Sequence, residues 1–121
     1  MKKVFLLAFL ILIGSSLYSQ PLPPIPIYPP GDTCVNVQNI HFNWHPSVGA
    51  TSYRIRVGGG PTYIIDSSGI VDTFFIPPVG IFNTMTSYYW TLKAYGPGGE
   101  SQWTPYWHFT TCPGIPGPPT L

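Results

Sequence analysis

The chain has 121 residues, of which only 7% are charged, with five basic and four acidic side chains. Globular domains usually carry about 25% charged residues. A chain so poor in charge has no basic patch for nucleic acid and no acidic tail, so its surface must be covered mainly by neutral polar residues, proline and tyrosine.

Residues 1–19 have the pattern of a secretory signal peptide. Lys2 and Lys3 form a basic start, residues 4–13 are apolar, and a segment rich in small residues ends at Ser19. The apolar run is shorter than the roughly 20 residues that a membrane-spanning helix needs. We therefore expect cleavage after Ser19, a secreted or cell-surface location, no membrane span in the mature chain, and a mature net charge near −1.

The next segment, residues 21–32, is rich in proline. Proline removes backbone donors, so this segment can lie at the edge of a sheet but not in its middle. Three runs that alternate in polarity follow, NIHFNW (39–44), SYRIRV (52–57) and YYWTLKAY (88–95). Such alternation is typical of half-buried strands. The residues predicted to face inward are Ile40, Phe42, Trp44, Tyr53, Ile55, Val57, Tyr88, Trp90, Leu92 and Ala94.

Weaker strands are predicted at TYIID (62–66), at DTFFIP (72–77) with Phe74 and Ile76 facing inward, and at TPYWHFTT (104–111). Clusters of Gly, Pro, Asp and Ser separate the runs, including one at residues 66–69 and one at 96–99. Short strands with turns at this spacing favour an antiparallel sandwich or small barrel of about seven strands.

The last two strands are predicted to form a hairpin whose loop is residues 96–101. This register places Tyr95 opposite Gln102, Lys93 opposite Thr104, Thr91 opposite Tyr106 and Tyr89 opposite His108. On the core face it pairs Ala94 with Trp103, Trp90 with Trp107 and Tyr88 with Phe109. Five rings are thereby predicted to be in the core: Tyr88, Trp90, Trp103, Trp107 and Phe109.

Cys34 and Cys112 are the only two cysteines, and they lie at the two ends of the patterned region. Disulfides persist in exported proteins, so the sequence favours a Cys34–Cys112 bridge. Two unpaired thiols, or bridges to another chain, are the alternatives.

From about Pro23 to Thr111 the pattern resembles a fibronectin type III domain of a secreted bacterial protein. The matching segments are the proline-rich first strand, FNW (42–44), GATSYRIRV (49–57), TSYYWTLKAYGPGG (86–99), and SQW (101–103) followed by WHFTT (107–111). The resemblance implies a seven-stranded antiparallel immunoglobulin-like β-sandwich over residues 21–112, with strands A, B and E facing strands C, C′, F and G.

The resemblance also implies a tyrosine corner at Thr86 and Tyr88, with Phe82 where the family often has leucine. It brings the start of strand B and the end of strand G to the same end of the domain, which supports the cysteine bridge. Residues 113–121 are expected to be a Pro/Gly linker that leads toward a further repeat, because PPTL resembles the PPIP that opens the domain.

The sequence contains no motif of a known catalytic site, and its acids Asp32, Asp66, Asp72 and Glu100 fall in turn-like contexts. His41 and His45 would lie about 13 Å apart on one strand, too far to share a metal ion. We therefore expect a protein that is not an enzyme and has no cofactor.

The outer face of the predicted C, F and G sheet is the candidate binding face. Its proposed contact residues are Tyr89, Tyr95, Tyr106, Arg54 and Arg56, with Thr91, Lys93 and His108 beside them. One hypothesis is a spacer or protein-interaction module within a larger surface or secreted protein. The alternative is a carbohydrate-binding module that uses the exposed tyrosines. Against both stands the simpler interpretation, which the pattern favours, that the tyrosines only stabilise the sheet through cross-strand pairs. Expected partners are other domains, a surface protein or a polysaccharide; the loop at 96–101 lacks the Arg-Gly-Asp tripeptide of some adhesion domains.

Overall fold

The computed structural model describes residues 18–114. The predicted signal peptide (1–19) lies almost wholly outside these residues, as does most of the predicted linker (113–121). No helix occurs between residues 18 and 114, and hence none that is long and apolar enough to cross a membrane.

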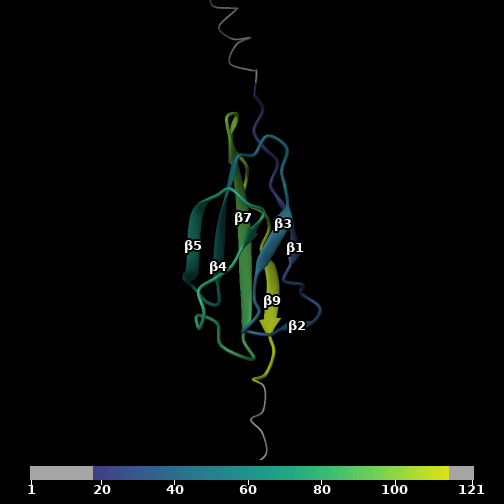
Figure 1. Cartoon of the computed structure of the whole chain (residues 1–121), viewed down its shortest axis with the longest axis vertical. Helices are drawn as coiled ribbons and strands as arrows, with labels where there is room; N and C mark the ends of the chain where they lie inside the picture. Colours follow the sequence, from purple (N-terminus) through teal and green to yellow (C-terminus); the bar gives the residue numbers. More distant parts are fainter. Residues whose placement is uncertain (1–17, 115–121) are drawn as a thin grey trace, which may run out of the picture.

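The chain folds into two facing β-sheets (Figure 1). The smaller sheet has the order β1-β3-β6, and the larger has the order β2-β9-β7-β4-β5, with the short β8 paired to β7. The strands are β1 (Ile25–Tyr28), β2 (Cys34–Val35), β3 (Phe42–His45), β4 (Ser52–Gly58), β5 (Tyr63–Ile70), β6 (Phe74–Phe75), β7 (Ser87–Gly96), β8 (Gly99–Glu100) and β9 (Trp107–Thr111). The predicted all-β sandwich is confirmed, with β1, β3 and β6 as strands A, B and E, and β4, β5, β7 and β9 as strands C, C′, F and G. The two-residue strands β2 and β8 were not predicted.

The core forms where the apolar faces of the two sheets meet. All ten side chains that strand alternation predicts to be inward are buried, and Phe42, Ile55, Val57, Trp90, Leu92 and Ala94 have no exposed area at all. Phe42 lies at the centre, with its ring edge-on to Trp90 at 5.0 Å and to Phe109 at 5.7 Å between centroids. Edge-to-face aromatic pairs stabilise a core beyond the area they bury. The proline-rich segment forms β1 at a sheet edge, as its missing backbone donors predict.

The prediction for β6 was wrong by one residue. Phe74 is 50% exposed and Ile76 is 70% exposed, whereas Phe75 packs against the core. The register explains the difference, because Phe75 pairs with the buried Phe42 and must share its face. A shift of one residue moves every side chain of a strand to the opposite face.

In the last hairpin, the predicted register is correct between β7 and β9 but wrong by two residues near the loop. Next to the core, Tyr88 pairs with Phe109, Tyr89 with His108 and Trp90 with Trp107, as predicted. Near the loop, however, Tyr95 pairs with Glu100 and Gly96 with Gly99, so the turn is only two residues long. The two residues saved in the turn reappear in the irregular segment 101–106 between β8 and β9.

Two tryptophans that were assigned to the core are not buried in it. Trp103 lies on the outer face of the larger sheet. Trp107 keeps the predicted side beside Trp90 but is 37% exposed, since β9 is covered at its outer edge by β2 only at Thr110 and Thr111.

A disulfide and a tyrosine corner stabilise one end of the sandwich. Cys34 and Cys112 form a disulfide, with 4.8 Å between their Cα atoms and a separation of 78 positions in sequence. The Tyr88 hydroxyl accepts a hydrogen bond from the backbone N–H of Asn83 at 2.8 Å, which is the predicted tyrosine corner. Phe82, in the position of the family's leucine, is buried with its ring edge-on to Tyr88.

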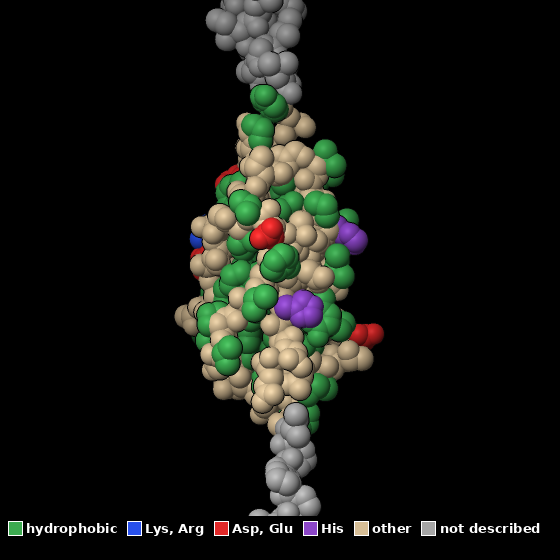
Figure 2. Space-filling model, viewed as in Figure 1, with side chains coloured by type: hydrophobic (Ala, Val, Ile, Leu, Met, Phe, Trp, Pro, Cys, Tyr) green, Lys and Arg blue, Asp and Glu red, His purple; other side chains and the backbone are tan. Residues whose placement is uncertain are grey.

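The exposed surface is poor in charge. Figure 2 shows one face of the molecule, where a few charged side chains are scattered among neutral polar and hydrophobic ones. The charges of the described chain are concentrated elsewhere, on the outer face of β4, β5 and β7.

Candidate functional site

Three neighbouring strands carry the charged residues of the predicted binding face, the basic ones on β4 and β7 and an acidic one on β5. Arg54 of β4 pairs with Lys93 of β7, and Arg56 pairs with Thr91 of β7 on one side and with Asp66 of β5 on the other. Directly paired residues point to the same face of a sheet, so these side chains lie together on the outer face.

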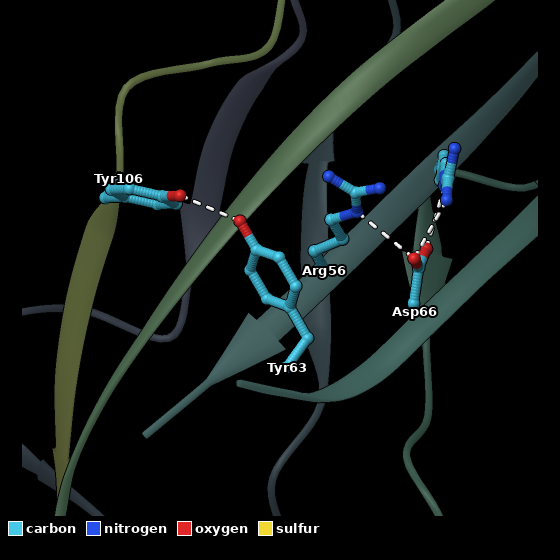
Figure 3. A network of polar contacts seen from close by, with 5 residues as sticks. Arg56, Tyr63, Asp66 and Tyr106 are labelled. Atoms are coloured by element: carbon cyan, nitrogen blue, oxygen red, sulfur yellow. Dashed lines mark hydrogen bonds and ion pairs between the residues drawn. The ribbon is translucent and has the colours of Figure 1, made fainter. Parts of the chain in front are cut away.

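Asp66 connects the two arginines (Figure 3). Arg54 donates from Nε and Nη2 to the two carboxylate oxygens at 2.8 Å each, and Arg56 donates from Nε at 3.1 Å. The hydrogen bond from Arg54 is the largest cause that holds the pKa of Asp66 below its usual value, and the same contact raises the pKa of Arg54. The sequence placed Asp66 in a turn, but β5 runs through this position without interruption, so the prediction for Asp66 was wrong.

Trp103 lies against the same cations. Its ring centroid is 4.6 Å from Cζ of Arg56, 5.3 Å from Nζ of Lys93 and 5.6 Å from Cζ of Arg54. A cation within about 6 Å of an indole face is attracted by the ring quadrupole. The prediction that Trp103 packs inside opposite Ala94 was therefore wrong, because the two-residue turn places Ser101 beside Ala94 instead.

Three tyrosines form the other half of the site. The Tyr63 and Tyr106 hydroxyls lie 2.8 Å apart in a hydrogen bond, and the Tyr89 ring is edge-on to Tyr106 at 4.9 Å. This hydrogen bond, the largest of several causes, raises the pKa of Tyr106 above its usual value. The Tyr89 hydroxyl donates to the carbonyl of Gly60 at 2.6 Å.

Gly58 makes the position of Tyr89 possible. A Cβ atom at Gly58, the register partner of Tyr89, would lie 2.5 Å from the tyrosine ring. Only glycine lets the ring lie across β4 toward Gly60.

A cleft of about 370 Å³ lies between these two groups. Its lining residues are Arg56, Tyr63, Thr91, Trp103, Thr104, Pro105 and Tyr106. Clefts of this size that combine aromatic walls with a few polar groups are typical of small-ligand sites.

The structure brings together some of the predicted binding residues and separates others. Arg56 and Tyr106 line the cleft, Tyr89 supports its tyrosine wall and Arg54 anchors Asp66. Tyr95 lies further along β7 beside Lys93, outside the cleft, and His108 pairs with Tyr89 on an exposed position of β9.

Sequence reasoning missed Tyr63 and Trp103. The alternation of TYIID would have indicated the position of Tyr63 if its pairing with Gly58 had been known. The position of Trp103 depends on the two-residue turn between β7 and β8, and no local pattern around Trp103 indicates that turn.

No three His, Cys, Asp or Glu side chains gather as a metal site between residues 18 and 114.

No family model and no curated protein matches the sequence. Among solved structures, the chain is similar to the solution structure of a fibronectin type III domain derived from human KIAA0970 protein. The TM-score is 0.53 at 15% identity, over 88% of this chain and 85% of that one. At this identity the likeness concerns the fold alone. The chain is thus an all-β sandwich with the fold of a fibronectin type III domain.

Proposed function

We propose that this chain is a non-enzymatic extracellular module that acts as a spacer or protein-interaction domain in a larger surface or secreted protein. The observation that carries the proposal is the placement of the two ends of the described chain, which leave the sandwich at opposite poles of its long axis (Figure 1). A domain with this geometry would place its N-terminal pole at a distance from whatever follows its C-terminal end. The disulfide at one pole supports an extracellular setting, where such bonds persist.

The test of this proposal is whether the purified chain is catalytically inert. We expect cooperative unfolding and no turnover on a panel of ester, glycoside and peptide substrates, because the outer-face carboxylate Asp66 is already held by two arginines. Turnover that disappears in Asp66→Asn or His108→Ala, with folding unchanged, would overturn the proposal.

A second candidate function is carbohydrate binding through the cleft. Its motivating observation is Tyr106, whose ring is 53% exposed yet held in place by the hydrogen bond to Tyr63 and the edge contact with Tyr89. A ring that is fixed before binding costs little side-chain entropy when a sugar stacks on it.

For carbohydrate binding, the matched variants are Tyr106→Ala and Phe74→Ala, because Phe74 is 50% exposed on the other sheet. We expect Tyr106→Ala to lose affinity on a glycan array by about tenfold or more, as for other stacked rings, and Phe74→Ala to retain it. Failure of the wild-type chain to bind any glycan would exclude this second function and leave the spacer role standing.

A further inference from the structure

We infer that the cleft takes an acidic sugar, a uronate unit of a polysaccharide whose carboxylate pairs with Arg56 while its ring stacks on Tyr106. This inference rests on the second proposed function and specifies its ligand class. Four observations carry it: the charge balance of the outer face, the unused donors of Arg56, the immobilisation of Arg56, and the size of the cleft.

The outer face has one positive charge in excess. Lys93 is paired with Glu100 at 2.8 Å, and the two arginines share the single carboxylate of Asp66. Arg54 occupies both Asp66 oxygens with two of its donors, so its charge is matched in a two-pronged contact. The unmatched charge therefore belongs to Arg56, which lines the cleft.

Arg56 also retains hydrogen-bonding capacity. A guanidinium has five N–H donors, and only the Nε of Arg56 meets a partner among residues 18–114. In Figure 3 its terminal nitrogens carry no dashed contact, whereas Nε is joined to Asp66. Two terminal N–H groups in one plane match the two oxygens of a carboxylate.

The guanidinium of Arg56 is held before any ligand arrives. Its Cζ is 4.6 Å from the Trp103 ring centroid and 5.0 Å from that of Tyr63, while Nε is fixed by Asp66. Because a pre-organised donor loses little entropy on binding, one such contact can select a ligand. The adjacent phenol of Tyr106 brings no competing negative charge at neutral pH.

The size of the cleft and the scarcity of other cations narrow the ligand class. A volume of about 370 Å³ suits a sugar unit better than a helix or a broad protein surface. A nucleic acid requires several cations along its backbone, whereas the three Lys and Arg residues of the described chain already share two carboxylates. A single cation beside an exposed ring fits one carboxylate attached to one sugar ring.

The experiment titrates the secreted chain with uronate oligomers and follows binding by calorimetry. The probes are oligomers of galacturonate, of mannuronate and of glucuronate with N-acetylglucosamine, each compared with its carboxyl-reduced form, which keeps linkage and size but removes the charge. We expect at least one acidic oligomer to bind about tenfold or more tightly than its reduced form, the usual effect of a charge-assisted hydrogen bond.

Two variants assign the effect to Arg56. Arg56→Gln should abolish the preference for the acidic form, and Arg56→Lys, which keeps the charge but not the planar pair of donors, should restore only part of it. The comparison of acidic with reduced oligomers uses unchanged protein, so it holds even if a variant unfolds.

Four outcomes would overturn the inference. Equal affinity for acidic and reduced oligomers, or binding of neutral glycans with none of the three uronates, would contradict the acidic ligand while leaving carbohydrate binding intact. Binding of a glutamate hexapeptide as tight as that of the best uronate would contradict the sugar. Failure to bind any glycan would remove the second proposed function together with the inference.

Discussion

Tyr88 links two parts of the core through different ends of one side chain. Its ring stacks on Phe109 at 5.5 Å and meets Phe82 edge-on at 4.9 Å, while its hydroxyl accepts the Asn83 N–H. The hydroxyl thereby satisfies a part-buried backbone donor in the loop that leads into β7.

We expect Tyr88→Phe to lower the free energy of unfolding by about 1–2 kcal/mol, because the substitution leaves the Asn83 N–H without its partner and changes little else. Urea unfolding measures the loss. Tyr28→Phe is the control, since the Tyr28 ring stacks on His41 and its hydroxyl has no hydrogen-bond partner between residues 18 and 114. Equal losses in the two variants would contradict a specific role of the corner.

At the scale of elements, part of β7 has no partner strand along one edge, and side-chain hydroxyls accept the hydrogen bonds of its backbone N–H groups there. The irregular segment 101–106 has no regular ladder, yet two hydroxyls replace it. Ser101 Oγ accepts from the N–H of Ala94 at 2.9 Å, and Thr104 Oγ1 accepts from the N–H of Leu92 at 3.0 Å. The backbone N–H groups of Ser101 and Thr104 donate in return to the carbonyls of Ala94 and Leu92. These bonds let the segment bulge outward and carry Trp103 to the outer face.

Thr104→Val keeps the shape of the side chain but removes the acceptor for the buried Leu92 N–H, and its hydrogen bond with Thr91. We expect a loss of about 1–3 kcal/mol in urea unfolding. Slow hydrogen exchange at Leu92 should become faster in the same variant. Thr104→Ser retains the hydroxyl and should lose less; a larger loss in Thr104→Ser than in Thr104→Val would contradict the hydrogen-bonding role.

At the scale of the whole molecule, the disulfide closes almost the entire sandwich into one loop. Cys34 begins β2, which pairs parallel with β9 just before Cys112, so the bridge lies beside a strand pair that already exists. A bridge between residues 78 apart restricts the unfolded chain by about 4 kcal/mol on the chain-entropy model.

Replacing both cysteines, Cys34→Ser with Cys112→Ser, is expected to lower the free energy of unfolding by about 4 kcal/mol. The measurement is urea unfolding with and without reductant. Reductant should destabilise the wild-type chain and have no further effect on the double variant. Two alkylated cysteines in the non-reduced protein would contradict the bridge.

Strand alternation predicted the inward faces of β3, β4 and β7 because these strands are long enough for their pattern to be unambiguous. The pattern failed where strands are short: in β6, one residue decided whether Phe74 or Phe75 faces the core, and only pairing with Phe42 determines it. The same limit applies to the residues of the candidate site. Arg54, Arg56 and Tyr89 belong to long strands and were correctly assigned to the outer face, whereas Trp103 was lost to the core.

The amino-acid sequence by itself therefore determined the sandwich, its central strands and their buried rings, because alternation is a local property with a fixed period. It also indicated the cysteine pair. The tertiary structure alone decided where the cleft is. The cleft depends on a two-residue turn, on a bulged segment after it, and on the pairing of β4 with β5 that brings Tyr63 and Asp66 beside Arg56. Strand alternation shows which side chains share a face, but it fixes neither the length of the turn between β7 and β8 nor the register of β4 against β5, which depend on contacts between the paired strands.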